Sequence, residues 1–295
     1  DEIPFAYEDL KDFNHKIIYY ESSRGCPFRC SYCLSSIDKR VRFRSLPLVE
    51  KELQIFLDAQ VPQVKFVDRT FNCNPKRTVE LLQWILEHDN GITNFHFEIA
   101  ADITTEEELA IMEKMRPGLI QLEIGVQSTN PKTVEAIHRT MDLKKLEKVV
   151  SRVKSFGNIH QHLDLIAGLP YEDVKSFQKS FDDVYAMRPD QLQLGFLKVL
   201  KGSGMREDAP GYGINWHERA PYEVLTTDWL SYGDVLLLKG VEDMVEVYYN
   251  SRQFDRTISK IMERYASPFL FFKELADFYE REGLAGIGHA RIARY

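Results

Sequence analysis

The chain has 295 residues and a net charge of −7, with 44% hydrophobic and 28% charged residues. This composition is that of a globular protein with a sizeable core and one or two domains. It excludes a general basic surface for nucleic acid, and no apolar run reaches the ~18 residues of a membrane span. No signal peptide is evident, and clustered cysteines without a disulfide framework predict a reducing, cytoplasmic setting.

Strand and helix patterns alternate through most of the chain, after a polar lead-in over residues 1–16. β-Branched and aromatic runs predict strands at 17–22, 64–68, 94–100, 119–126, 159–167 and 191–199. Apolar residues at helical spacing predict intervening helices that begin at Pro47, Pro75, Thr105, Leu143 and about residue 171. Thr105 and Glu108 form a capping-box pattern, and Gly157 is placed to end the helix that begins at Leu143.

Six strand–helix alternations predict an α/β fold with a parallel sheet and right-handed crossovers. Six units are too few for a closed eight-stranded barrel, so we expect a partial (β/α)6 TIM-type barrel. Its strands are apolar on one face and polar on the other, as where Leu122 and Ile124 oppose Glu123 and Gly125. Closed barrels fill their interior with branched apolar residues, and polar groups there are costly unless paired or hydrated. The polar faces therefore predict a wet, ligand-filled interior.

The alternation stops near Gly202. Residues 202–221 are rich in Gly, Pro and charge and predict a linker or an active-site flap, and a helical pattern follows from Pro221. We expect the aromatic residues of this region to pack against the barrel. The predicted organisation is a lead-in over 1–16, the barrel over 17–203, and a linker with a C-terminal helical extension over 204–295.

Three of the four cysteines lie close together, as Cys26, Cys30 and Cys33, in a C-x3-C-x2-C pattern. Such spacing lets three thiolates converge from one loop, and thiolates suit zinc, copper(I) or an iron–sulfur cluster. A structural zinc site normally has a fourth Cys or His nearby, whereas Cys73 is far along the chain. Three ligands leave one metal position open, which is typical of a catalytic site.

With Tyr32 before the last cysteine, the segment from Arg24 to Cys33 resembles the signature of the radical SAM superfamily. The resemblance implies that the three cysteines hold three irons of a [4Fe-4S] cluster, while S-adenosylmethionine chelates the fourth and Tyr32 lies near the adenine. One electron from the cluster would cleave the sulfonium to methionine and a 5′-deoxyadenosyl radical. A zinc-binding module and a non-catalytic iron–sulfur electron-transfer protein are the alternatives.

Further segments sharpen the resemblance. Gly125–Ser128, Arg139 and Leu163–Pro170 resemble the branch that includes oxygen-independent coproporphyrinogen oxidase, Elongator-type proteins and methylthiotransferases. The match implies that Arg139 pairs with the carboxylate of S-adenosylmethionine, a task suited to a guanidinium fork. It also implies that the ribose hydroxyls and methionyl group are bound by Glu98, Gln127 and Asp164. The structural alternatives are an ion pair between Glu98 and Arg139 and a helix-capping role for Asp164.

One segment departs from the family pattern. Many members carry Gly-Gly-Glu after the second strand to hold the amino group, whereas this chain has Asp68, Arg69 and Thr70 there. We still expect these three residues to bind the cofactor. Cys73, just beyond them, is a candidate radical quencher or hydrogen donor, with an unreactive thiol as the alternative.

The lead-in Ile3–Tyr7 and the segment Val67–Asn72 look like radical SAM proteins that carry an amino-terminal cobalamin-binding domain. No Asp-x-His-x-x-Gly cobalamin motif is present, so we expect any such domain, and cobalamin-assisted methyl transfer with it, to lie outside this chain. The family implies an electron donor such as flavodoxin or ferredoxin. The substrate cannot be read from the sequence; the inward-facing side chains that either bind it or line the core are His96, His160 and His162.

Overall fold

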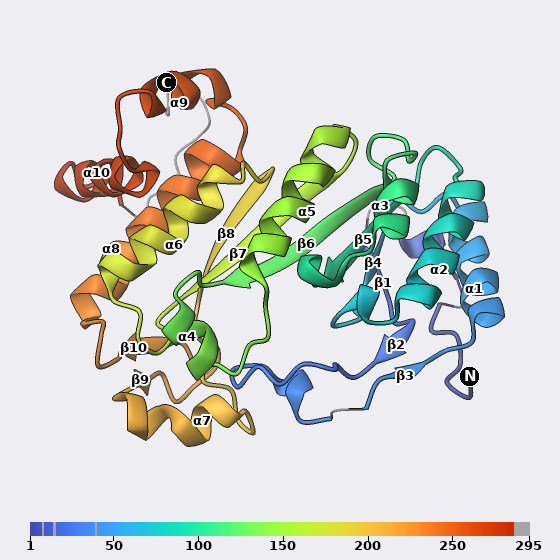
Figure 1. Ribbon diagram of the computed structural model, residues 1–295, viewed down its shortest axis with the longest axis horizontal. Coiled ribbons are helices and arrows are strands. Elements are labelled where there is room, and N and C mark those ends of the chain that lie inside the picture. Colours follow the sequence, from blue (N-terminus) through green and yellow to red (C-terminus); the bar gives the residue numbers. More distant parts are fainter. Residues whose placement is uncertain (8, 14–15, 39, 286–295) are drawn as a thin grey trace.

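The computed structural model describes residues 1–7, 9–13, 16–38 and 40–285 (Figure 1). Parts of the predicted lead-in and helical extension, at residues 8, 14–15 and 286–295, lie outside the described residues. One sheet of six parallel strands forms the centre, in the order β1-β4-β5-β6-β7-β8. The strands are β1 Ile18–Tyr20, β4 Gln63–Phe66, β5 Asn94–Ile99, β6 Ile120–Gln127, β7 His160–Ala167 and β8 Gln191–Phe196.

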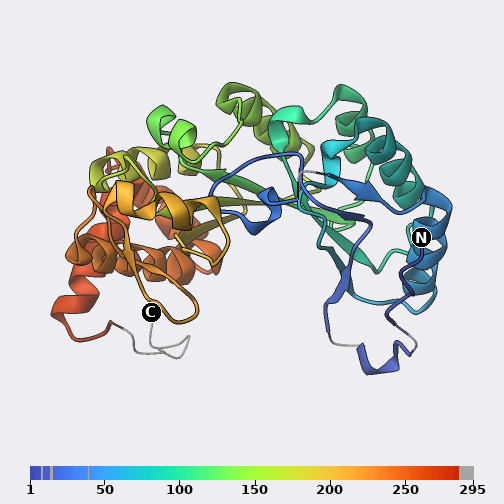
Figure 2. The same ribbon diagram turned by 90° about the horizontal axis from the view of Figure 1, so that it is seen from below.

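The sheet is an open arch, because its first and last strands, β1 and β8, each pair on one side only within the described residues. Helices lie along the outer, convex side of the arch (Figure 2). They are α1 Leu46–Asp58, α2 Pro75–Glu87, α3 Glu106–Met112, α4 Pro131–Ala136, α5 Leu143–Phe156 and α6 Val174–Ala186. The predicted α/β fold with six parallel strands is therefore confirmed.

The local signals in the sequence explain where these helices begin and end. Thr105 and Glu108 form the expected capping box at the start of α3. Gly157 ends α5 in the left-handed conformation, at a φ of 71°, which glycine adopts without steric cost.

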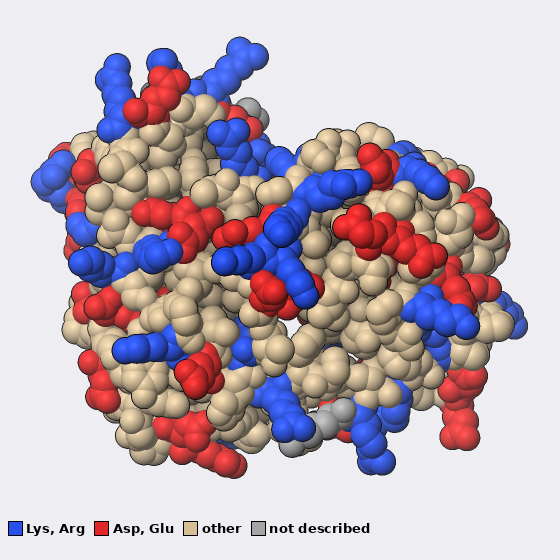
Figure 3. Space-filling view, viewed as in Figure 1, with Lys and Arg blue, Asp and Glu red and all other residues tan. Residues whose placement is uncertain are grey.

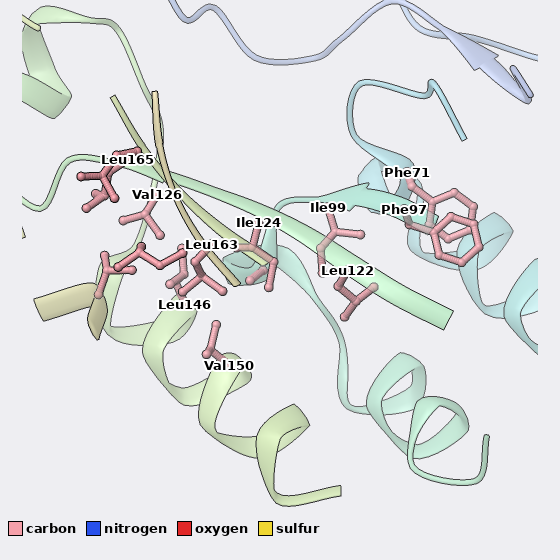
Figure 4. Close-up of a cluster of buried hydrophobic side chains, with 14 of the residues drawn as sticks. Phe71, Phe97, Ile99, Leu122, Ile124, Val126, Leu146, Val150, Leu163 and Leu165 are labelled. Atoms are coloured by element: carbon pink, nitrogen blue, oxygen red, sulfur yellow. The ribbon is translucent and has the colours of Figure 1, made fainter. Parts of the chain in front are cut away.

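The hydrophobic core lies between the sheet and the helices. Figure 4 shows Ile124 of β6 and Leu163 of β7 on the side of the sheet that faces Leu146 and Val150 of α5. All four side chains are fully buried or nearly so. The apolar strand faces thus pack outward on the helices, and the polar faces are left for the inside of the arch.

The segment after the barrel is folded rather than an extended linker. It contains the short helix α7 Gly204–Asp208 and an antiparallel pair, β9 Asn215–Trp216 with β10 Val224–Thr226. The backbone N–H of Met205 donates to the Ser31 carbonyl at 2.8 Å, which ties α7 to the cysteine loop. Such tertiary contacts stabilise elements that are too short for a periodic pattern to reveal.

The remaining helices are α8 Tyr232–Val245, α9 Asp255–Met262 and α10 Pro268–Arg281, with a π-helical turn Glu246–Asn250. Phe269 and Phe272 of α10 pack on Phe181 of α6 at ring-centroid distances of 5.7 and 5.9 Å, so these aromatics pack on the barrel as expected. Short 3₁₀ turns occupy Lys11–Phe13, Leu34–Ser36, Phe71–Cys73, Ala101–Ile103 and Ala209–Tyr212.

Acidic and basic side chains are interspersed over the face shown in Figure 3. In the part of the chain that the structure describes, no helix has both the length and the apolar character needed to span a membrane.

Candidate functional site

The cysteine loop crosses the carboxyl ends of the strands, between the short antiparallel strands β2 Ser23–Arg24 and β3 Arg42–Phe43 (Figure 1). Cys26 and Cys30 are buried, Cys33 is half-buried, and all three thiols are free. The loop is fixed by its backbone, since the Ser31 N–H donates to the Ile137 carbonyl at 2.9 Å. The thiols therefore have defined positions at the edge where barrel enzymes place their active sites.

The three cysteines line one cavity of about 210 Å³, which we call the cysteine cavity. Most of the residues predicted to bind the cofactor line it as well, namely Tyr32, Arg69, Thr70, Glu98, Gln127, Arg139 and Asp164. Asp68 and Cys73 are not among its lining residues. The fold thus brings together side chains from the cysteine loop, from the segments after β4 and α4, and from the three strands β5, β6 and β7.

Arg139 links the loop to the sheet. Its Nη1 lies 3.3 Å from the Tyr32 hydroxyl and 3.8 Å from Cys30 Sγ, and its Nη2 donates to the Gly125 carbonyl. Its Nε is buried with no hydrogen-bond partner in the described structure. Among the described residues Arg139 makes no ion pair with Glu98, so its guanidinium lines the cavity with one donor, Nε, left without a partner.

Gln127 reaches the cavity through a distortion of its strand. The register of β6 against β7 shifts between Gly125 and Gln127, and Gln127 has a φ of 72°. A Cβ on Gly125 would lie 2.3 Å from Gln127 Nε2, so a side chain at this position would displace the Gln127 amide from where it lies. Gln127 Oε1 is buried without a hydrogen-bond partner within the described residues. Strained, under-satisfied residues of this kind cluster at ligand sites.

Carboxyl groups form the opposite wall of the cavity. Burial, followed by the charge of Glu123, raises the pKa of Glu98 from 4.5 to about 7. Burial likewise raises the pKa of Asp164, against the opposing effect of His162, whose Nε2 lies 3.0 Å from Asp164 Oδ1. A positive charge or a hydrogen-bond donor in the cavity would stabilise the charged forms of Glu98 and Asp164.

Asp68 lies below the loop, where it is buried and fully engaged. Its carboxylate accepts hydrogen bonds from the Ser22 N–H at 2.8 Å, the Ser22 hydroxyl at 2.7 Å and the Ser23 hydroxyl at 2.6 Å. Thr70, by contrast, places its Oγ1 3.6 Å from Cys26 Sγ, and Arg69 is exposed beside the cavity. The three neighbouring residues therefore occupy different environments.

A polar network lines the inside of the arch around an inner cavity, next to the cysteine cavity. Glu123 accepts a hydrogen bond from Lys65 Nζ at 2.9 Å and has His96 Nε2 at the same distance, and these partners lower its pKa to about 2. His160 and His162 line the same inner cavity of about 530 Å³. The predicted polar interior is confirmed, but sequence reasoning missed Lys65, since period-two alternation alone does not distinguish an ion pair from a ligand site.

Cys73 lies at the end of the turn Phe71–Cys73, where it is half-buried. Burial raises the pKa of its thiol to about 11. The protonated form is therefore favoured at neutral pH.

Comparison with known proteins defines the family. The sequence model of the radical SAM superfamily matches residues 20–184. The chain belongs to the radical SAM superfamily. A second model, described as a protein of unknown function (DUF4080), matches residues 210–295. The boundary between the two matches falls in the segment that leads from the barrel into the C-terminal region.

Relatives of this radical SAM chain include methyltransferases and oxidases. The uncharacterized methyltransferase PH0819 of Pyrococcus horikoshii is 24% identical over 269 residues, which are 89% of this chain and 53% of that protein. The oxygen-independent coproporphyrinogen III oxidase of Salmonella typhimurium is 25% identical over 195 residues, 62% of this chain and 39% of that protein. The chain thus spans about half the length, or less, of these curated relatives, and the predicted enzyme branch is confirmed.

A solved structure shares the fold. The radical S-adenosylmethionine methyltransferase TsrM from Kitasatospora setae, with cobalamin and a [4Fe-4S] cluster bound, aligns with a TM-score of 0.61 at 17% identity. The alignment covers 70% of this chain and 43% of that one. At this level of identity the likeness shows the fold alone.

The residues of the cysteine cavity fit the group that the family implies. Soft thiolates are the ligands that iron–sulfur clusters require. The free donors of Arg139 and the free acceptor of Gln127 suit the carboxylate and the hydroxyl or amino groups of S-adenosylmethionine. Within the described residues, no three His, Cys, Asp or Glu side chains gather as ligands of a single ion.

Proposed function

We propose that the chain is the catalytic core of a radical SAM enzyme, in which Cys26, Cys30 and Cys33 hold a [4Fe-4S] cluster. When bound, the cluster and S-adenosylmethionine together supply one-electron cleavage of the sulfonium, which produces the radical that acts on a substrate. The observation that carries the proposal is the convergence of three thiols with the unpartnered Arg139 Nε and Gln127 Oε1 on one cavity.

The chain's own residues bind and orient the cofactor in this proposal. The guanidinium of Arg139 pairs with the carboxylate of S-adenosylmethionine, because its position is already fixed by Gly125 and Tyr32. Gln127 and Asp164 hydrogen-bond the polar groups of the ribose and the methionyl moiety. Glu98 binds a cationic or hydrogen-bond-donating group, which would lower its raised pKa and stabilise its charged form.

We propose further that the reaction is a cobalamin-assisted methyl transfer, with the corrinoid bound by a part of the protein outside this chain. The support is that PH0819 is named a methyltransferase and that TsrM is a methyltransferase with bound cobalamin. A donor such as flavodoxin or ferredoxin would supply the electron.

Cluster binding is tested by anaerobic reconstitution followed by metal analysis. We expect about four irons in the protein, and 5′-deoxyadenosine released when it is reduced with S-adenosylmethionine present. Cys30→Ala should lose both, whereas Cys73→Ser, the matched control outside the cavity, should keep both. Stoichiometric zinc without iron would refute the proposal in favour of a zinc module.

The electron-transfer alternative predicts a cluster that S-adenosylmethionine cannot reach. An electron paramagnetic resonance spectrum of the reduced cluster that is unchanged by S-adenosylmethionine would support that alternative. Cobalamin involvement is tested on the natural full-length protein by absorbance of bound corrinoid. Transfer of isotope from methyl-labelled S-adenosylmethionine to a product is the second readout, and a full-length protein without corrinoid would remove this part of the proposal.

A further inference from the structure

A second and larger cavity, of about 620 Å³, adjoins the cysteine cavity; we call it the side cavity. The two cavities share five lining residues, Tyr32, Cys33, Arg69, Gln127 and Asp164. The volume of the side cavity is within the ~300–1,000 Å³ that is usual for small-molecule sites. A molecule held there would lie beside whatever fills the cysteine cavity.

The space in the side cavity depends on a glycine. Gly195 of β8 lies on the less buried, inward face of the strand together with Gln191 and Gln193, and both Gln193 and Gly195 line the side cavity. A Cβ built on Gly195 would meet only the Leu165 carbonyl oxygen, at 3.5 Å, an ordinary contact. The backbone therefore tolerates a side chain at this position, and the absence of one leaves the cavity open.

The outer wall of the side cavity comes from α8 and carries charges of both signs. Lys239 Nζ lies 2.6 Å from Glu223 Oε1 and 4.3 Å from the centroid of the Phe196 ring, so the charge of this lysine is already paired. Glu242 lies one turn further along α8 and lines the same cavity. In the described part of the chain Glu242 has no ion-pair partner within 4 Å, and burial raises its pKa against the opposing charge of Lys239. It is an acid that a cation would stabilise.

The opposite wall carries a guanidinium without an ion-pair partner among the described residues, that of Arg69. Arg69 follows β4, on the far limb of the arch from β8 and α8, and its side chain is exposed. Within the described residues Arg69 makes no ion pair. The side cavity thus has Arg69 on one limb, and on the other limb Glu242 together with Lys198 and the Lys239–Glu223 pair, which lies beside the Phe196 ring.

We propose that the side cavity is the substrate site and that it takes a molecule bearing both an ammonium and a carboxylate group, an amino acid or the end of a peptide. Glu242 binds the ammonium, Arg69 binds the carboxylate, and the hydrocarbon part of the substrate lies against Phe196. This assignment rests on the proposed radical SAM function. Under this assignment the C-terminal region selects the substrate. This region is the part of the chain that matches the family of unknown function.

Binding of defined probes tests this assignment without turnover. The probes are L-phenylalanine, L-leucine and L-methionine, each with the matched amine that lacks the carboxylate and the matched acid that lacks the amine. Saturation-transfer NMR and calorimetry on the cluster-loaded protein should show dissociation constants for the amino acids at least about tenfold below those of both analogues. This factor follows from one charge-assisted hydrogen bond.

Variants locate the site. Glu242→Gln should weaken amino-acid binding at least about tenfold and leave the matched acid unaffected. Gly195→Val should weaken amino-acid binding at least about tenfold, because its side chain takes up part of the side cavity next to Phe196. The controls are Asp243→Asn, the exposed neighbour of Glu242, and Gly211→Val, a glycine with no atom within 4 Å of its built Cβ. Both controls should bind as the wild type does.

The assignment is overturned if none of the amino acids binds, if the single-charge analogues bind equally well, or if the controls weaken binding as much as the cavity variants. Release of 5′-deoxyadenosine by the same preparations separates this result from failure of the proposed function. A protein that cleaves S-adenosylmethionine but ignores the probes refutes only the substrate assignment. A protein that binds the probes but never cleaves S-adenosylmethionine refutes only the proposed function.

Discussion

Asp68 anchors the start of the cysteine loop, and its loss should destabilise the protein whether or not a cofactor is bound. Its buried carboxylate accepts three hydrogen bonds from two residues, Ser22 and Ser23. Asp68→Ala would leave three donors without their acceptor, and each such donor costs about 1–3 kcal/mol when buried. Because the three bonds share one carboxylate, the costs are not fully additive. We expect the free energy of unfolding to fall by about 3–5 kcal/mol.

Urea unfolding of the metal-free protein, followed by circular dichroism, measures this effect. The midpoint should fall without a change in the m-value, because the native fold is kept. Asp58→Ala is the matched control, since the Asp58 carboxylate is exposed and accepts one hydrogen bond from Gln54. Its cost should be within about 0.5 kcal/mol. A thiol reagent should also modify the buried Cys26 and Cys30 faster in Asp68→Ala than in the control.

Asp68→Asn should lower the free energy of unfolding by about 1–3 kcal/mol, less than Asp68→Ala and more than Asp58→Ala. The reason is that the amide keeps one acceptor oxygen. If both Asp68 variants have free energies of unfolding within about 0.5 kcal/mol of the wild type, the Asp68 carboxylate does not anchor the loop. If they also lost affinity for S-adenosylmethionine, Asp68 would be facing the ligand and not the two serines.

Three further predictions concern the cysteine cavity and its surroundings. The pKa of Glu98, raised from 4.5 to about 7, adds stability below pH 4.5 that is lost as the pH rises through 7. Urea unfolding of the unliganded protein should show that the free energy of unfolding falls between pH 5 and pH 8. This fall should be smaller by about 1–3 kcal/mol in Glu98→Gln than in the wild type. An equal fall in both proteins would contradict the raised pKa of Glu98. Arg139→Lys keeps the charge but cannot bond Gly125 and Tyr32 together, so calorimetry should show S-adenosylmethionine binding weakened about tenfold or more. With its pKa near 11, Cys73 should be alkylated by iodoacetamide with a midpoint above pH 10, and a midpoint near 8.5 would show a solvated thiol.

Periodicity was sufficient to predict the six strands of the sheet and the longer helices that cover it, but not the short helix α4. Because these strands pack helices on one face and line a polar interior on the other, their sequences alternate strongly, and β6 and β7 begin and end within one residue of their predicted ranges. Caps are equally local, since the capping box of α3 needs only Thr105 and Glu108. The features that could be predicted, strand alternation and helix caps, depend only on residues that are close together in the sequence.

The parts that the sequence could not predict depend on contacts between distant segments. Asp68, Arg69 and Thr70 follow β4 in succession, yet one is bound to Ser22, one is exposed and one lies beside Cys26. Their directions are set by the loop after the strand, where period-two alternation has ended. The register shift of β6 against β7 before Gln127 has Gly125 as its only local signal, and that glycine does not reveal which side chain the shift turns toward the cavity. The side cavity needs α8, which folds back on the barrel from far along the chain.

The lead-in and the C-terminal region complete the open sheet. An open sheet exposes unpaired backbone groups on its two outer strands, which invite edge-to-edge association. On β1 the hydroxyl of Tyr7 accepts from the Tyr19 N–H at 3.0 Å and donates to the Tyr19 carbonyl at 2.6 Å. On β8 the Asn250 amide likewise satisfies both the N–H and the carbonyl of Leu192, each at 2.9 Å. A closed barrel would pair these edges with each other, whereas here two side chains cap them, and the arch stays open over its polar interior.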